Sequence, residues 1–322
     1  MNKFKDDSTV ILIDALNLFT RHYVAHPAMN INGDPVGGIV GFLYAITNLA
    51  EKFNPNNIIV VWESGGSPRR RAIYPDYKSK RRPQQLNRQY KDDIPDTVEN
   101  RNFQISFIVE CLNLTPICQV YVKDCEADDV IGYLSKYKLE KCKKLIVSSD
   151  KDFYQLLNDK TLIYSPTWKK IVTHKEVREK FSVSPDNFCL AKSVCGDPSD
   201  NIPGVKGVGF KTLSKRFPIL KDISTVTIKE IVEISKTSVS EGSKIKAYES
   251  ISTSEDLIRR NWKLTYLDVS NLSAYQIQKV NESIDTFVPV RNKIELMRTL
   301  IKEGIQTFNI DRMFLSLGAI GL

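Results

Sequence analysis

Short apolar runs rich in β-branched residues recur through the first half of the chain. They lie at 9–13, 57–62, 119–122 and 144–148. Their length and composition are typical of strands buried in a parallel sheet. Helical periodicity lies between or after them, at 39–53, 100–114 and 130–138. This alternation predicts an α/β fold with a mostly parallel central sheet and flanking helices.

Two further apolar runs, 162–164 and 168–172, flank a Ser165-Pro166 turn and predict a hairpin. From Asp186 onward the apolar positions follow helical spacing with short loops between them. We therefore expect a boundary at this point, between an α/β domain at 1–185 and a helical domain at 186–322.

Acidic residues stand at or just after the end of each predicted parallel strand. They are Asp14, Glu63, Glu126, Asp128, Asp129, Asp150 and Asp152. Open α/β sheets hold their ligands at this edge, and if strands 119–122 and 144–148 are neighbours, the acids of both converge there. Carboxylates so close repel one another unless cations lie between them, and oxygen ligands select Mg²⁺ or Mn²⁺. The alternative for 126–129 is an ordinary interaction with the dipole of the helix that follows.

A strongly basic segment follows the second strand. Its cations are Arg69, Arg70, Arg71, Lys78, Lys80, Arg81, Arg82, Arg88 and Lys91, with Tyr74, Tyr77 and Tyr90 between them. Such a segment cannot form a core, and the mixture of cations and aromatic rings is typical of proteins that bind single-stranded nucleic acid. A solvated loop is the alternative, but the position after Glu63 favours an element that lies over the acidic edge.

The composition supports a nucleic-acid partner. The 322 residues include 46 Lys and Arg against 38 Asp and Glu, a net charge of +8 that favours a polyanion. The six cysteines form no Cys-x-x-Cys pair and no signal peptide is evident, so we expect reduced thiols and a cytoplasmic protein. Three scattered histidines exclude a zinc site, and no apolar run reaches transmembrane length, so no membrane contact is expected.

A glycine-rich segment follows two further acids, Asp197 and Asp200. It contains Gly204, Lys206, Gly207, Gly209 and Lys211. Glycines that expose backbone N–H groups before a helix can bind phosphate. The segment therefore predicts a helix-hairpin-helix-like motif that holds a DNA backbone, and a simple loop between helices is the alternative.

Together these motifs resemble those of the 5′-nuclease family. The matching residues are Asp14, Tyr77-Lys78-Ser-Lys80-Arg81-Arg82-Pro, Glu126-Ala-Asp128-Asp129, Ser149-Asp150-Lys-Asp152-Phe and Gly196-Asp197 with Asp200-Asn-Ile-Pro-Gly. The family includes the 5′-nuclease domain of bacterial DNA polymerase I, flap endonucleases, and phage 5′→3′ exonucleases of the T4 ribonuclease H type. The resemblance covers roughly residues 9–265 and implies a PIN-like sheet, a basic helical arch at 66–100 and a helical DNA-binding region.

The resemblance also implies a two-metal phosphodiesterase. One Mg²⁺ would be held by Asp14, Glu63, Glu126, Asp128 and Asp150, and a second by Asp129, Asp152, Asp197 and Asp200. Lys78 and Arg81 would stabilise transition-state charge, with Tyr77, Lys80 and Arg82 beside them on the DNA. The 204–209 hairpin would bind duplex and K⁺. Glu63 departs from the family, which usually has Asp there, and so does Ala15, where Gly is common.

The implied activity is 5′→3′ exonuclease and 5′-flap endonuclease cleavage, with a role in primer removal during replication. Expected partners are branched or nicked duplex DNA, RNA·DNA hybrids and replication proteins such as single-stranded-DNA-binding protein. We expect a monomer, in the host cytoplasm if a phage encodes it. A non-catalytic nucleic-acid-binding protein would explain the charge but not the acids at the strand ends. A PIN-type ribonuclease would share the acids but lack the glycine hairpin.

Overall fold

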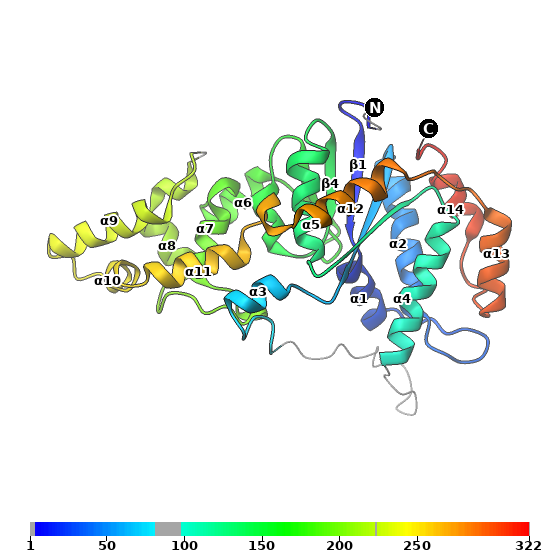
Figure 1. The fold of residues 1–322 in the computed structure, drawn as a ribbon, viewed down its shortest axis with the longest axis horizontal. Coiled ribbons are helices and arrows are strands. Elements are labelled where there is room, and N and C mark those ends of the chain that lie inside the picture. Colours follow the sequence, from blue (N-terminus) through cyan, green and yellow to red (C-terminus); the bar gives the residue numbers. More distant parts are fainter. Residues whose placement is uncertain (1–3, 81–97, 223, 322) are drawn as a thin grey trace.

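The computed structural model describes residues 4–80, 98–222 and 224–321, and a single six-stranded sheet forms its centre (Figure 1). The strands are β1 Thr9–Asp14, β2 Asn57–Ser64, β3 Cys118–Lys123, β4 Lys143–Val147, β5 Thr161–Ser165 and β6 Lys170–Val172. Their order is β3-β2-β1-β4-β5-β6; β6 runs antiparallel to β5 and the other pairs are parallel. The predicted mostly parallel sheet and its hairpin are confirmed.

The strands at 119–122 and 144–148 are not neighbours, so the condition considered for the convergence of their acids is not met. β1 pairs with both β2 and β4, so two strands separate β3 from β4. The acids after β3 nevertheless approach the others, because the next helix, α5 (Ala127–Tyr133), packs against β2 and β1. A crossover helix, rather than strand pairing, thus carries these acids to the centre of the sheet.

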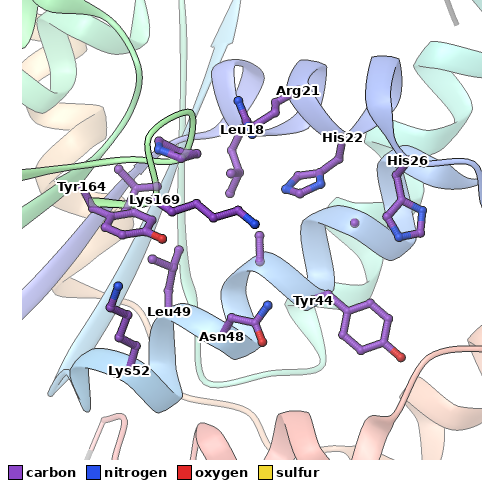
Figure 2. Close-up of a pocket in the computed structure, with 14 residues that line it drawn as sticks. Leu18, Arg21, His22, His26, Tyr44, Asn48, Leu49, Lys52, Tyr164 and Lys169 are labelled. Atoms are coloured by element: carbon purple, nitrogen blue, oxygen red, sulfur yellow. The ribbon is translucent and has the colours of Figure 1, made fainter. Parts of the chain in front are cut away.

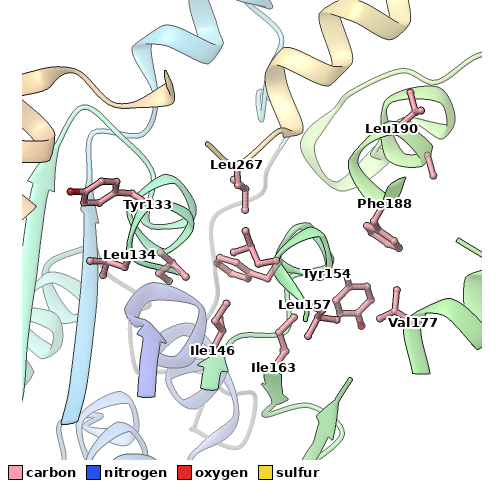
Figure 3. Close-up of a cluster of buried hydrophobic side chains, with 14 of the residues drawn as sticks. Tyr133, Leu134, Ile146, Tyr154, Leu157, Ile163, Val177, Phe188, Leu190 and Leu267 are labelled. Atoms are coloured by element: carbon pink, nitrogen blue, oxygen red, sulfur yellow. The ribbon is translucent and has the colours of Figure 1, made fainter. Parts of the chain in front are cut away.

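Both faces of the sheet are buried. In β1, successive side chains point alternately into the two apolar clusters on the two faces. Val10 and Leu12 belong to one apolar cluster, whereas Ile11 and Ile13 belong to the other. Figure 3 shows part of the first cluster, in which Ile163 of the sheet lies near Leu157, while Tyr133 of α5 and Phe188 of α7 lie further out on either side. Burial on both sides explains why these strands read as continuous apolar runs.

Helices account for most of the remaining described residues. The α-helices are α1 Ala15–Ala25, α2 Gly37–Phe53, α3 Pro68–Ile73, α4 Val98–Asn113, α5 Ala127–Tyr133, α6 His174–Phe181, α7 Pro185–Cys195, α8 Phe210–Arg216, α9 Ile228–Ser240, α10 Lys246–Ser252, α11 Glu255–Thr265, α12 Ala274–Asp285, α13 Lys293–Lys302 and α14 Ile310–Ser316. Shorter helical turns are η1 Leu134–Lys138, η2 Lys151–Leu156, η3 Pro198–Asp200, η4 Pro218–Lys221 and η5 Val269–Asn271.

Helix α1 and the start of α2 were not expected from the sequence. Asp14 caps α1 by accepting a hydrogen bond from the Asn17 amide, so the residue that ends β1 also begins a helix. Gly38, which precedes the predicted helix at 39–53, lies in the first turn of α2, where a Cβ would collide with the Phe19 ring. The glycine therefore permits close packing of α1 on α2.

The region after Pro185 is helical, as expected, but it does not stay apart from the sheet. Helices α8 to α11 extend to one end of the molecule in Figure 1. The chain then returns, and α12 packs on β3 while α14 packs on α2. The boundary near 185 thus marks a change of secondary structure, while residues beyond 274 complete the α/β core.

Within the described residues, no helix has the length and apolar character needed to cross a membrane. All six cysteines are free thiols, five of them buried.

Candidate active site

Four carboxylates line one cavity of about 270 Å³ at the carboxyl edge of the sheet. Asp14 ends β1 and Glu63 lies near the end of β2. Asp128 lies in the first turn of α5, and Asp150 follows β4. We call this cavity the acidic cleft. Its four acids come from four separate segments, so only the folded sheet brings them together.

Burial and mutual repulsion raise the pKa values of two of these acids, Asp14 and Asp128. Burial raises the pKa of Asp14 to about 7, with further increases from Glu63 and Asp150, although Asn17 and Ser148 donate hydrogen bonds that oppose the shift. Burial also raises the pKa of Asp128 well above its usual range, and Asp150 and Asp14 add to that effect. A divalent cation would relieve this repulsion, and carboxylate oxygens are the ligands that hard cations prefer.

Glu126 lies beside the cleft in a network of hydrogen bonds. Its Oε2 accepts from Lys78 Nζ at 2.7 Å and from the Tyr77 hydroxyl at 3.0 Å. Although burial raises its pKa, Arg70 and Lys78 hold the pKa of Glu126 below its usual range. Glu126 is therefore ionised, and Lys78, which also lines the cleft, is fixed by it.

Tyr77, expected to contact DNA, is not at the surface of the structure. Its side chain is buried, and its hydroxyl reaches Asp200 Oδ2 at 3.4 Å as well as Glu126. A buried ring cannot stack on a base. Tyr77 instead joins two acidic segments, and the backbone amide of Lys78 donates to the Asp200 carbonyl next to it.

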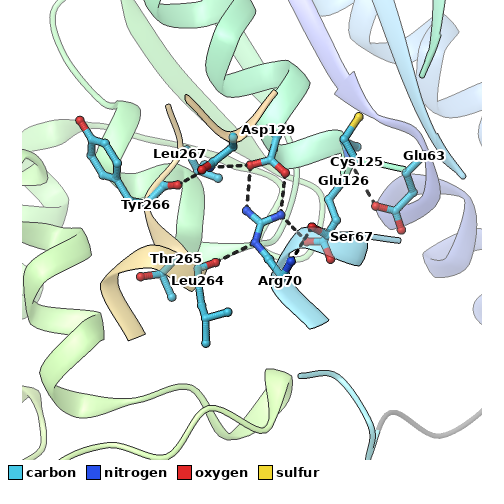
Figure 4. Close-up of polar contacts among 12 residues, drawn as sticks. Glu63, Ser67, Arg70, Cys125, Glu126, Asp129, Leu264, Thr265, Tyr266 and Leu267 are labelled. Carbon is cyan, nitrogen blue, oxygen red and sulfur yellow. Dashed lines mark hydrogen bonds and ion pairs between the residues drawn. The ribbon is translucent and has the colours of Figure 1, made fainter. Parts of the chain in front are cut away.

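Asp129, expected as a metal ligand, forms a buried ion pair with Arg70 (Figure 4). The guanidinium donates to both carboxylate oxygens, at 2.6 and 2.8 Å, and its Nε donates to the Leu264 carbonyl. Asn271 donates a further bond to Asp129 at 2.8 Å. Both oxygens of Asp129 are thus already paired, and the Arg70–Asp129 pair links α3, α5 and the end of α11.

We expect Arg70→Met to destabilise the protein by about 3–5 kcal/mol, because it leaves the buried Asp129 carboxylate without its cation. The free energy of unfolding in urea measures this. The matched control is Arg71→Met. The Arg71 side chain is exposed and donates to the Gly65 carbonyl, so its loss should lower the free energy of unfolding by less than about 1 kcal/mol. Equal losses in the two variants would contradict the structural role of Arg70.

A second group of acids lies next to the cleft, formed by Asp152, Asp197 and Asp200. One carboxylate oxygen from each lies within 4.8 Å of the others. Burial raises the pKa of Asp152 to about 7, while Lys192 opposes the increase and Asp150 adds to it. We call this group the second acidic cluster.

Lys192 of α7 was missed in the sequence. Its ammonium contacts Asp152 and lies 2.6 Å from Asp197 Oδ2. The available signal was a lysine directly after the apolar run 188–191 of a helix, because a buried lysine has to find an acid. Lys192 supplies one positive charge to the second acidic cluster, so that cluster is less repulsive than three acids alone.

The glycines of the 204–209 segment have different roles. Gly204 packs so closely that a Cβ would overlap the Cys195 carbonyl. Gly207 has φ +75 with open space around it, so only the backbone turn requires glycine there, and Gly209 precedes α8. Lys206 and Lys211 are exposed beside them. The segment connects α7 and η3 to α8, and the helix-hairpin-helix assignment stays a prediction.

Of the predicted arch cations, Lys78 reaches the acidic cleft and Lys80 is exposed. Arg81 and Arg82 lie in 81–97, the part of the expected arch that is outside the described residues. Four lining residues of the acidic cleft were not predicted as site residues: Leu16, Asn17, Thr20 and Arg101. Arg101 lies on α4, and no motif in the sequence marked it.

Comparison with known proteins gives concordant matches. A family model described as the 5′-3′ exonuclease N-terminal resolvase-like domain matches residues 9–182. A 5′-3′ exonuclease of Buchnera aphidicola (subsp. Acyrthosiphon pisum) is 34% identical over 66% of this chain and 70% of its own length. A 5′-3′ exonuclease of Aquifex aeolicus is 34% identical over 63% of this chain and 67% of its own length.

The fold is similar to that of the T5 D15 protein crystallised with metal ions. The TM-score is 0.64 at 20% identity, over 90% of this chain and 99% of the T5 chain. The PIN-like fold inferred from the motifs is thereby confirmed, as is the resemblance to 5′ nucleases. The chain belongs to the 5′-3′ exonuclease family.

Proposed function

We propose that this protein is a structure-specific, divalent-metal-dependent 5′ nuclease that hydrolyses phosphodiester bonds near the 5′ end of branched or nicked duplex DNA. The observation that carries this proposal is the acidic cleft. Four carboxylates from separate segments meet in one cavity, and two of them have strongly raised pKa values. Clustered carboxylates that repel one another would destabilise a protein that only binds nucleic acid. Metal-dependent hydrolysis, by contrast, requires such a cluster of carboxylate ligands.

Mg²⁺ is the cation we propose, with Mn²⁺ as a substitute, because the donors are all oxygen. The first ion would be held by Asp14, Glu63, Asp128 and Asp150, with Glu126 beside them, and the second by the second acidic cluster. Asp129 is left out because Arg70 occupies both its oxygens. Bound cations supply the charge that activates a water and stabilises the leaving oxygen.

Two cations of the described residues line the cleft, Lys78 and Arg101, and Lys78 is the one that contacts a carboxylate beside it. Glu126 accepts a hydrogen bond from the Lys78 ammonium. The turn that contains Lys78 is anchored on both sides, because Asn201 donates to the Asp76 carbonyl and to the Ser79 hydroxyl. A charge fixed before substrate arrives can stabilise developing negative charge without reorganisation. Lys78 thus directs positive charge at the phosphate that reacts, and we propose Arg81 as its companion.

Duplex binding is proposed for the exposed Lys206 and Lys211 with the glycines between and beside them. Together they present cations and backbone amides to phosphate. A K⁺ ion at 204–209, bound by backbone carbonyls, belongs to the same proposal. Tyr77 is not included, since it is buried.

The proposed substrates are 5′ flaps and RNA·DNA hybrids, and the proposed role is primer removal. We propose that the protein acts as a monomer and that single-stranded-DNA-binding protein is a partner. Structures with related folds support branched DNA as a substrate. A T5 D15 flap endonuclease was solved with DNA and metal ions, and human GEN1 with Holliday junction DNA.

The test is a cleavage assay on three labelled substrates, a 5′-flapped duplex, an RNA·DNA hybrid and single-stranded RNA, with Mg²⁺ or with EDTA. We expect Mg²⁺-dependent cleavage of the first two near the 5′ end and none with EDTA. Preference for single-stranded RNA would indicate the PIN-type ribonuclease alternative. Binding without any cleavage would indicate a non-catalytic nucleic-acid-binding protein.

A further inference from the structure

Figure 2 shows a second cavity, which is lined by residues of α1 other than those that line the acidic cleft. Asn17 and Thr20 of α1 line the cleft, whereas Leu18 and His22 line this cavity. Helix α2 and the turn between β5 and β6 form its other walls, and its volume is about 460 Å³. We call it the α1–α2 pocket. Its size is within the range of small-molecule sites.

The pocket is lined by cations from three separate elements. Arg21 comes from α1, Lys52 from α2 and Lys169 from the β5–β6 turn. Among the described residues that line it there is no carboxylate. Like charges gathered around one cavity disfavour one another, so the arrangement favours an anionic ligand.

Lys169 lies in the β5–β6 turn with a backbone conformation that is unusual for a residue other than glycine. Its φ is +52, a left-handed conformation that non-glycine residues rarely adopt. Figure 2 shows its side chain extending across the pocket, between Tyr164 and Leu18. Strained residues of this kind occur where a side chain has a task at a binding site.

The floor of the pocket is apolar and includes aromatic rings. Leu18, Leu49 and Val147 are buried there. The Lys52 ammonium lies 4.9 Å from the centre of the Tyr164 ring. At the other end the Tyr44 hydroxyl donates to the Thr307 carbonyl at 2.7 Å, which fixes that ring. The pocket therefore offers an apolar surface for a flat ring below a cationic mouth.

His22 adds a neutral polar group. Its imidazole packs against α2 at Gly41, where a Cβ would lie 2.6 Å from Nδ1, so glycine leaves room for it. Burial, with help from His26 and Arg21, lowers its pKa to about 4. An uncharged imidazole can donate one hydrogen bond and accept another, as recognition of a base or sugar requires.

We propose that the α1–α2 pocket binds a nucleoside 5′-monophosphate. The base lies on the apolar floor beside Tyr164, and the phosphate lies among Arg21, Lys52 and Lys169. Arg21 donates to the Thr167 hydroxyl through Nη1, an anchor that orients its guanidinium for a phosphate. This site is separate from the acidic cleft and needs neither its acids nor a metal.

The test titrates the full chain with deoxyadenosine 5′-monophosphate, deoxyadenosine or inorganic phosphate, all in EDTA. Calorimetry gives affinity, and NMR of the histidine rings gives location, because the chain has only three histidines. His22 and His26 line the pocket, while His174 begins α6 and lies 3.9 Å from Asp159. We expect the monophosphate to shift the first two signals and not the third, and to bind at least about tenfold more tightly than either fragment.

Lys169→Gln should weaken monophosphate binding about tenfold, the effect of losing one charge-assisted phosphate contact. The matched control is Lys170→Gln, one residue further on, whose side chain pairs with Glu176; it should leave affinity unchanged. Asp150→Asn, in the cleft, should also leave it unchanged. The proposal is overturned by absence of binding, by equal affinity for phosphate alone, by equal effects at 169 and 170, or by loss of binding in Asp150→Asn.

Discussion

Asp150→Asn is expected to reduce cleavage of a 5′-flapped duplex on the order of 10³-fold while DNA binding is kept or strengthened. Asp150 follows β4 and faces Asp14 and Asp128 across the acidic cleft. The amide removes both a metal-binding oxygen and a negative charge that faces phosphates. Single-turnover rates with Mg²⁺ and equilibrium binding with EDTA measure the two effects separately.

The matched control is Asp159→Asn, an equally conservative change of an exposed acid whose contact in the structure is His174. It should cleave and bind like the wild type. Near-normal cleavage by Asp150→Asn would show that the acidic cleft is not the catalytic centre. Loss of DNA binding together with cleavage would show that Asp150 acts through the fold.

Lys78→Met is expected to slow single-turnover flap cleavage by about 10²-fold, with little change in binding to blunt duplex. Lys78 lines the acidic cleft, and Glu126 holds its ammonium at 2.7 Å. Loss of a preorganised charge at the reacting phosphate has an effect of this size. Saturating enzyme at several salt concentrations separates the rate from the affinity.

Lys80→Met is the matched control, since Lys80 belongs to the same turn but is exposed. If Lys80 contacts a single-stranded phosphate, its loss should reduce the salt slope of flap binding by about 0.7 and leave the rate of bound enzyme unchanged. Wild-type cleavage by bound Lys78→Met would contradict its role at the reacting phosphate. A similar loss of cleavage rate in both variants would indicate that the segment around Lys78 and Lys80 acts only as a general electrostatic patch.

Much of the fold was predictable, because strands buried on both faces appear in the sequence as continuous apolar runs. The runs at 9–13 and 57–62 became β1 and β2, and the Ser165-Pro166 turn became the β5–β6 connection. Helix α1 was missed, since Asp14 was considered only as an acid at a strand end and not also as a helix cap.

The candidate site was predictable to a similar extent. Acids at strand ends mark the same edge of a parallel sheet, so the sequence could group Asp14, Glu63 and Asp150. Their ligand roles stay predictions. What could not be predicted was which acids already had partners. Nothing in the order of residues pairs Arg70 with Asp129, or Lys192 with Asp152, because each pair is far apart in the chain and is joined only by packing.

The sequence by itself determined the family, the parallel sheet and the set of acids, since local periodicity and short motifs carry that information. Only the tertiary structure decided the strand order, the burial of Tyr77, the pairing of Asp129 and the position of Lys192. It alone also gathered Arg21, Lys52 and Lys169 around one pocket. The physical reason is that ion pairs and pockets depend on distances between remote segments, and those distances exist only after the apolar faces have packed.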